Sequence, residues 1–119
     1  MKCLSIYPEY IFEIMTGEKT EEYRTWWTKH RGNLLLACTK TKYNNPHICL
    51  LVDLVDCVKY DNDDYGFTLE NIRLIKPIPI KGRQRMYNTP FELEDLEIID
   101  KSEKQKMIEM YKDWFNIKK

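Results

Sequence analysis

The sequence predicts a single α+β domain, mostly β, built as a small barrel with one early helix and an amphipathic helix added near its C-terminus. The chain has 119 residues, which suffice for one hydrophobic core but not for two. Its 43% hydrophobic and 32% charged residues are typical of a globular protein, not a disordered one. Apolar runs follow one another mid-chain without helical segments between them, which disfavours a doubly wound parallel sheet.

The first elements are a short strand and a helix. The apolar run "CLSI" at 3–6 is typical of a strand, and Pro8 suits the first turn of a helix. Helical spacing then relates Tyr10, Ile11, Ile14 and Met15. Gly17 is expected to end this helix of residues 8–16 in a left-handed conformation, so that "EEYRTW" at 21–26 begins extended.

Buried strands are expected next, because residues 33–40 and 47–60 are rich in Leu, Val, Ile and Cys. A polar loop at 41–46 joins them, and the longer run is expected to bend or bulge near Asp53–Asp56. After a turn at 61–66, the run 67–82 alternates in part. Its Pro77 and Pro79 indicate an edge or an irregular strand, and "RMYN" at 85–88 suits one more short strand.

The C-terminal segment is expected to form a helix over residues 102–115. "SEKQ" at 102–105 has the spacing of a capping box. An apolar face follows, made of Met107, Met110, Tyr111 and Trp114 with Ile108 and Phe115 beside it. We expect this face to pack on the core; the alternative is a helix that binds a partner.

The positions of the four cysteines indicate the redox environment of the protein. None forms a C-x-x-C pair, and all lie in apolar stretches: Cys3, Cys38, Cys49 and Cys57. We expect reduced thiols in a cytoplasmic protein with no metal and no cofactor; a disulfide or a zinc site is the alternative. No apolar run reaches the roughly 20 residues of a membrane span, and we expect no signal peptide.

Charge is balanced overall but unevenly distributed. The formal net charge is zero, which argues against a strong polyanion binder. However, residues 24–42 and 73–85 each contain five Lys or Arg residues and no acid, whereas 60–66 and 92–100 are acidic. The chain therefore presents either one basic and one acidic face or two ordinary solvated surfaces.

Residues 17–32, "GEKTEEYRTWWTKHRG", gather charges of both signs around two tryptophans. In an extended chain Glu22, Arg24 and Trp26 point to one side. Glu22 would then lie between Lys19 and Arg24, leaving donors beside an indole that suit a phosphate or a base edge. The alternatives are a plain salt bridge, with one tryptophan in the core and the other on the surface.

These residues resemble the N-terminal half of an ASCH domain, named for the activating signal cointegrator. The matching positions are Leu4-Ser5, Gly17, Lys19, Glu22, Arg24, Trp26, His30-Arg31-Gly32 and Lys40. "LLVDLVDCVKY" and "PIPIKGRQRMYN" resemble the family's long strand and its closing segment. The resemblance covers roughly residues 2–88 of a single domain 1–119, with a helical extension at about 101–117.

The resemblance implies a PUA-like fold, which is a small, partly open β-barrel with a cleft between helix and barrel. Such domains are associated with RNA, with modified nucleotides and with translation-linked or coactivator complexes. We therefore expect this chain to bind RNA, single-stranded nucleic acid or a modified nucleotide. The residues expected at the site are Lys19, Glu22, Arg24, Trp26, His30, Arg31, Lys40, Lys81 and Gln84.

Two other functions remain open. Some bacterial relatives are amidohydrolases that deacetylate N4-acetylcytidine with a lysine, a threonine and a glutamate, and a few relatives are reported as ribonucleases. Lys19 matches the lysine, but Glu22 stands at the threonine position, and Glu70 is the one glutamate near the third, so binding is favoured over catalysis. The other alternative is a protein-interaction or regulatory module that uses residues 92–117, with a Lys-, Asn- and Tyr-rich composition that would suit a phage or an AT-rich bacterium.

Overall fold

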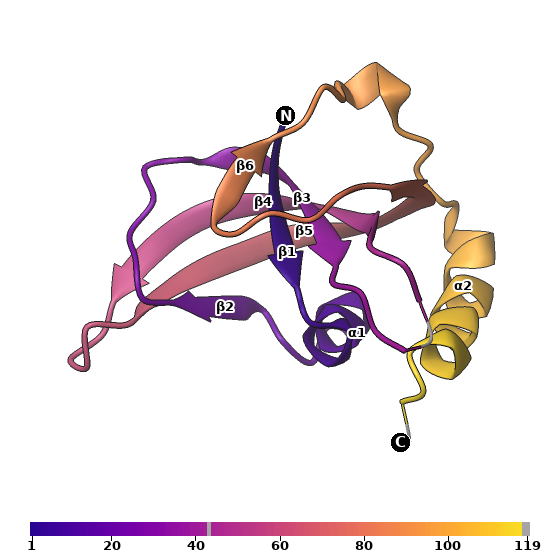
Figure 1. Ribbon diagram of the computed structural model, residues 1–119, viewed down its shortest axis with the longest axis horizontal. Helices are drawn as coiled ribbons and strands as arrows, with labels where there is room; N and C mark the ends of the chain where they lie inside the picture. The colour runs from indigo at the N-terminus through magenta and orange to yellow at the C-terminus, as the bar shows by residue number, and fades with distance from the viewer. Residues whose placement is uncertain (43, 118–119) are drawn as a thin grey trace.

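The computed structural model describes residues 1–42 and 44–117; Tyr43, in the expected polar loop, lies outside the described residues. Its strands are β1 (Lys2–Ile6), β2 (Glu21–Arg24), β3 (Gly32–Cys38), β4 (His47–Lys59), β5 (Tyr65–Pro79) and β6 (Met86–Asn88). The helices are α1 (Pro8–Thr16) and α2 (Lys101–Trp114), with a single 3₁₀ turn at Leu93–Asp95. The expected order of strand, helix, several strands and a terminal helix is confirmed (Figure 1).

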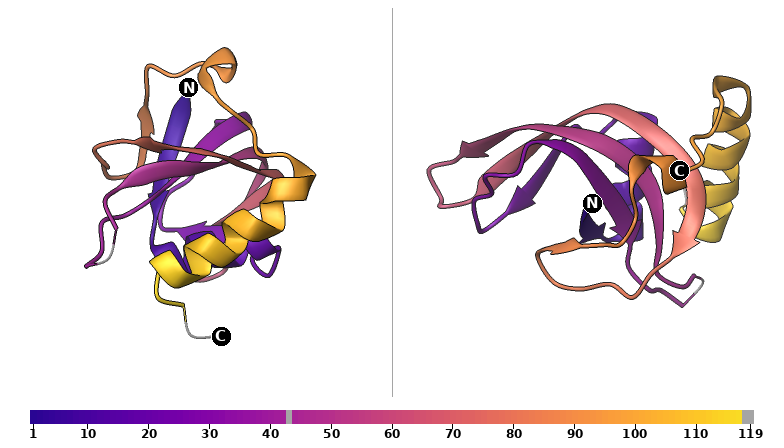
Figure 2. Two further views of the ribbon diagram at one scale, coloured as in Figure 1. Left: turned by 90° about the vertical axis from the view of Figure 1, so that its right-hand side faces the viewer. Right: turned by 90° about the horizontal axis from the view of Figure 1, so that it is seen from above.

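One mixed sheet of six strands forms the body of the molecule, in the order β2-β5-β4-β3-β1-β6. Among the described strands β1 and β3 alone pair in parallel, and the connection between them carries both α1 and β2. The sheet curls strongly into a half-barrel (Figure 2). Because β2 leaves β1 and pairs with β5 at the far edge, the curl brings residues 21–24 back beside β1 and α1.

The predicted limits of α1 are confirmed. Proline stands at the first position of the helix, and Gly17 adopts a φ of 85° while its N–H donates to Ile14 O. Such a left-handed residue ends a helix at little steric cost only when it lacks a Cβ. The helix buries Ile11, Phe12, Ile14 and Met15 against the concave side of the sheet.

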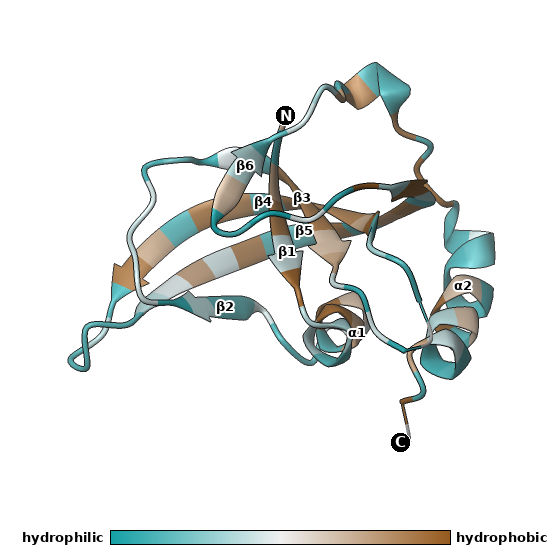
Figure 3. Cartoon of the chain, in the orientation of Figure 1, coloured by the Kyte–Doolittle hydropathy of each residue, from teal (hydrophilic) through white to brown (hydrophobic). Residues whose placement is uncertain are grey.

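The central strands are buried on both faces, which explains their unbroken apolar runs. Leu34 and Leu36 belong to the core cluster that includes both helices. Leu35 and Ala37 point the other way and pack in a second cluster, which the segment 78–96 covers. Figure 3 shows the hydrophobic colour of β3 and β4 in contrast to hydrophilic β2.

Two local irregularities predicted for the sheet are confirmed. The β4–β5 register shifts between Leu51 and Asp53 and again between Leu54 and Asp56. The second irregularity is at the other end of β5, because β2 pairs with β5 only along Tyr65–Thr68. Opposite β4, this end has, in the described part of the chain, only an isolated bridge between Ile75 and Ile98, which lies before Pro77 and Pro79. A proline, which donates no hydrogen bond, is tolerated at such an edge.

The beginning of α2 differs from the prediction. The helix follows an extended Asp100 and starts at Lys101, so the capping box at 102–105 is wrong. Pairing with the sheet fixes this start, because the Ile99 N–H donates to Leu74 O just before the helix. The core-facing stripe is confirmed for Ile108, Tyr111 and Phe115, with Met107 and Trp114 packed against them, but Met110 is 43% exposed.

The cysteines are unpaired, and three of the four are buried while Cys57 is half-buried. Within residues 1–42 and 44–117 no three His, Cys, Asp or Glu side chains gather closely enough to hold a metal ion. Neither helix in this part of the chain has the length and apolar character needed to cross a membrane.

Candidate ligand-binding cleft

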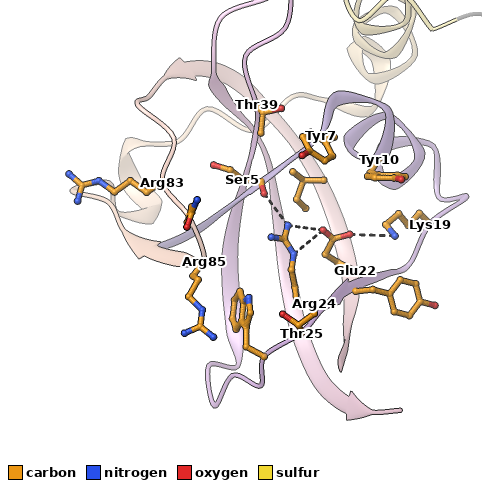
Figure 4. A pocket seen from close by; sticks show the side chains of 14 residues that line it. Ser5, Tyr7, Tyr10, Lys19, Glu22, Arg24, Thr25, Thr39, Arg83 and Arg85 are labelled. Atoms are coloured by element: carbon orange, nitrogen blue, oxygen red, sulfur yellow. Dashed lines mark hydrogen bonds and ion pairs between the residues drawn. The ribbon is translucent and has the colours of Figure 1, made fainter. Parts of the chain in front are cut away.

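A cleft of about 890 Å³ opens between α1, β2 and the segment 83–85. Its floor comes from β1 and β2, and α1 and the 83–85 segment lie on opposite sides of it (Figure 4). Tyr23 lies beside Lys19 on the α1 side, and Trp26 lies beside Arg85 on the other. The lining residues are Ser5, Ile6, Tyr7, Tyr10, Lys19, Glu22, Tyr23, Arg24, Thr25, Trp26, Thr39, Arg83, Gln84 and Arg85.

An ion-pair network forms the floor. Glu22 Oε1 lies 3.4 Å from Lys19 Nζ, and Glu22 Oε2 accepts from Arg24 Nη2 at 2.8 Å and from Arg24 Nε at 3.2 Å. The carboxylate side chain is only 8% exposed, whereas the side chains of Lys19 and Arg24 are 15% and 24% exposed. The predicted placement of Glu22 between two cations is confirmed.

Local structure explains how these three side chains meet. The Lys19 N–H donates to Glu13 O at 3.0 Å, which folds the chain back over the end of α1. In β2, Glu22 pairs with Phe67 and Arg24 with Tyr65, so that alternate side chains point into the curl. Arg24 Nη2 also donates to Ser5 O at 3.0 Å and thereby joins β2 to β1 across the open side of the sheet.

Trp26 and the 83–85 segment form one wall. The Trp26 ring meets Phe67 edge-on, with centroids 5.1 Å apart, and the Arg85 guanidinium lies 5.0 Å from the centroid of the indole. This cation–π contact covers a face of the ring. Trp26 is thus half-buried and its neighbour Trp27 is 54% exposed, which matches the alternative of one inner and one outer tryptophan.

Exposed tyrosines form the other wall. Tyr7, Tyr10 and Tyr23 are 62%, 41% and 54% exposed. Lys19 Nζ lies between two of them, 5.2 Å from the Tyr10 centroid and 5.0 Å from the Tyr23 centroid. Figure 4 shows Tyr10 and Lys19 on the side of the cleft opposite Arg83 and Arg85.

A hydroxyl pair closes the floor near β1. Ser5 Oγ lies 2.9 Å from Tyr87 Oη, which also accepts from Cys3 Sγ at 3.4 Å. Burial is the main cause that raises the pKa of Tyr87 far above its usual range. A Cβ added to Gly82 would lie 3.2 Å from Ser5 Oγ, so the lack of a side chain there lets the segment 80–85 approach β1 closely.

Five of the nine residues predicted for the site line the cleft: Lys19, Glu22, Arg24, Trp26 and Gln84. His30 instead bonds Asn33 O through Nε2 at 2.8 Å, and Arg31 donates to Thr28 O and His30 O, so both stabilise the loop before β3. Lys40 and Lys81 are exposed and are not among the lining residues.

Sequence reasoning missed several lining residues. Arg83 and Arg85 belong to the acid-free segment 73–85, which was the one available signal for them. Nothing in the spacing of Ser5, Tyr7 or Tyr10 distinguishes them from ordinary strand and helix residues. Glu70 is exposed on β5 and does not line the cleft, and Glu22 is the carboxylate that does.

The comparison with protein families agrees with this arrangement. The family model of the ASCH domain matches residues 4–118, which is nearly the whole chain. The chain belongs to the ASCH domain family. The match extends beyond residues 2–88, which carry the resemblance in sequence motifs, and includes the segment of α2. No curated protein matches the sequence.

Solved structures show the same fold at low sequence identity. The ASCH protein from Zymomonas mobilis is similar over 92% of this chain and 94% of that protein, with a TM-score of 0.59 and 15% identity. A Tyr-to-Phe variant and a Ser-to-Ala variant of it give TM-scores of 0.59 and 0.58. The chain therefore has the fold of these ASCH structures, consistent with the expected α+β PUA-like fold.

Proposed function

We propose that this ASCH domain binds nucleic acid in its cleft: RNA, another single-stranded nucleic acid or a modified nucleotide. The observation that carries the proposal is the composition of the lining. Four cationic side chains, Lys19, Arg24, Arg83 and Arg85, stand beside a single carboxylate and three exposed tyrosines. Cations suit phosphate, and aromatic faces suit bases of any sequence.

The floor and the wall contribute differently to anion binding. Glu22 balances part of the charge of Lys19 and Arg24, but Arg24 Nη1 makes no hydrogen bond within residues 1–42 and 44–117. That nitrogen can donate to a ligand without breaking the network. Arg83 and Arg85 are exposed on the opposite wall and add charge that no carboxylate of the lining offsets.

The wall arginines provide the sharper test, because they are exposed and Arg24 also holds β2 to β1. Anisotropy titrations with a labelled single-stranded RNA should show weaker binding for Arg83→Ala and Arg85→Ala. The slope of log affinity against log salt should fall by about 0.7 for each lost phosphate contact. Lys106→Ala, an exposed cation on α2, is the matched control and should leave both quantities unchanged.

Two results would contradict the proposal: no RNA binding by the wild-type domain at low salt, or equal losses for Lys106→Ala and the wall variants. Either result would shift attention to a protein partner on residues 92–117.

A second candidate is an amidohydrolase acting on N4-acetylcytidine-type nucleosides. It is favoured by one observation, the Lys19 amine held 3.4 Å from a carboxylate inside the cleft. In such a reaction water adds to the acetyl carbonyl and the C–N bond breaks, giving cytidine and acetate. Chromatography after incubation with N4-acetylcytidine tests it; turnover that Lys19→Ala abolishes would support it, and no turnover by the wild type would exclude this substrate.

A further inference from the structure

Four exposed tyrosines form a row that starts in the cleft wall and ends outside it; we call this row, made of Tyr7, Tyr10, Tyr23 and Tyr60, the tyrosine ridge. The centroids of Tyr7 and Tyr10 are 6.4 Å apart, and those of Tyr23 and Tyr60 are 6.0 Å apart. The ammonium of Lys19 links the two pairs at 5.2 Å from Tyr10 and 5.0 Å from Tyr23. Tyr60 is 38% exposed and, unlike the other three, does not line the cleft.

The outer end of the ridge depends on the absence of a side chain at Gly66. Tyr23 pairs with Gly66 on β5, and Gly66 pairs with Val58 on β4. A Cβ added to Gly66 would overlap the Glu21 carboxylate and approach Tyr60 Cε2 within 2.8 Å. The missing side chain therefore lets Glu21 and Tyr60 lie over β5, where the Tyr60 hydroxyl donates to Glu21 Oε1.

We infer that the ligand of the cleft is a single-stranded oligonucleotide that leaves it over the tyrosine ridge and whose last contact is the ring of Tyr60. This inference rests on the proposed function. The cleft of about 890 Å³ is at the upper end of the roughly 300–1,000 Å³ of small-ligand pockets, which leaves space for more than one nucleotide. Along the edge of the cleft the ridge offers ring faces for bases, with the Lys19 ammonium beside two of the rings, and Tyr60 offers one more ring face outside the cleft lining.

The end of this path is set by charge. The residues after Tyr60 form an acidic turn with Asp61, Asp63 and Asp64. These carboxylates repel phosphates, so a strand gains nothing by extending past Tyr60. The site is thus finite, at about four nucleotides, the low end of the roughly 4–16 that small nucleic-acid-binding barrels cover.

The experiment compares uridine monophosphate with oligouridylates of increasing length. Affinity should rise to about four nucleotides and then level off. Tyr60→Ala should weaken the binding of the longer oligomers about tenfold, because a stacked base contributes roughly 1–3 kcal/mol, while leaving the mononucleotide unchanged. Tyr60→Phe, which keeps the ring, should retain most of the affinity. Leu93→Ala, at another exposed apolar side chain, is the control.

The outcomes separate the two proposals. If neither the mononucleotide nor any oligomer binds, the proposed function itself fails. If the mononucleotide binds as tightly as the longest oligomer, or if Tyr60→Ala has no effect on any length, the function stands and the path over the ridge is overturned. Circular dichroism of Tyr60→Ala confirms that the variant is folded.

Discussion

Two polar clusters lie beside the helices of the domain. One is a network of ion pairs, whereas the other is uncharged. At the cleft, Glu22 is held between Lys19 and Arg24; all three line the cleft, and the two cations are more exposed than the carboxylate. Beneath α2, Cys38 and His47 form a pair with Sγ and Nδ1 3.2 Å apart. Both residues of that pair are buried.

The cluster beneath α2 is neutral because the helix excludes water. The His47 ring stacks on Trp114 at 4.8 Å and on Tyr111 at 5.7 Å, both with interplanar angles of 13°. Burial lowers the pKa of His47 and raises the pKa of Cys38 to about 11, so neither group carries charge at neutral pH. His47 Nδ1 lies 2.8 Å from Asn45 O, a bond that the neutral ring can donate.

The comparison of the two clusters shows where an ionised side chain is stable in this fold. A charge is stable where opposite charges compensate it and water still reaches the group, whereas a fully covered group stays neutral. The first arrangement leaves cations available to a ligand. The second leaves only packing and hydrogen bonds. The Cys38–His47 cluster therefore serves the docking of α2, and the Glu22 network is the one that suits the proposed binding.

The largest effect is expected from breaking the charged cluster. Glu22→Ala leaves two cations close together and should lower the free energy of unfolding by about 3 kcal/mol, the low end of values for buried pairs, because Lys19 and Arg24 keep some solvent. Urea unfolding measures the loss. Glu22→Gln, which keeps a hydrogen-bond acceptor, should cost less; equal stability of Glu22→Ala and wild type would show that the network is not structural.

The neutral cluster should reveal itself through pH. Because the folded state lowers the pKa of His47 below the ordinary value near 6.5, the unfolded chain takes up a proton that the folded one excludes. This contribution to the free energy of unfolding should be fully present above about pH 6.5. Below that pH it should fall by up to about 1.4 kcal/mol per pH unit. Urea unfolding at a series of pH values between neutral and mildly acidic should show this slope in wild type and in the control His30→Gln. His47→Gln should show a smaller slope. An unchanged slope in His47→Gln would contradict the assignment.

The smallest effect comes from two tyrosine hydroxyls that differ in their partners. Tyr111 Oη is buried with no hydrogen-bond partner among the described residues, whereas Tyr87 Oη bonds with Ser5 and Cys3. Tyr111→Phe should therefore leave stability unchanged or raise it by about 1 kcal/mol, and Tyr87→Phe should lower it by about 1 kcal/mol. Thermal unfolding compares them, and a loss in Tyr111→Phe as large as that in Tyr87→Phe would imply an unseen partner such as a buried water.

What the sequence by itself determined about this ASCH domain is local. Proline and glycine fixed the limits of α1, the apolar runs marked the central strands, and strand alternation placed Glu22 and Arg24 on one side. Each depends on residues only a few positions apart, where backbone sterics and side-chain periodicity are decisive.

Tertiary structure alone decided the rest. Arg85 reaches Trp26 because the chain after β5 returns across β1, and Arg24 reaches Ser5 because β2 crosses to the far edge of the sheet. The start of α2 follows from the bond between Ile99 and Leu74, not from its own capping residues. These contacts join segments far apart in the chain, and their geometry is set by the curl and packing of the whole sheet, which no local pattern encodes.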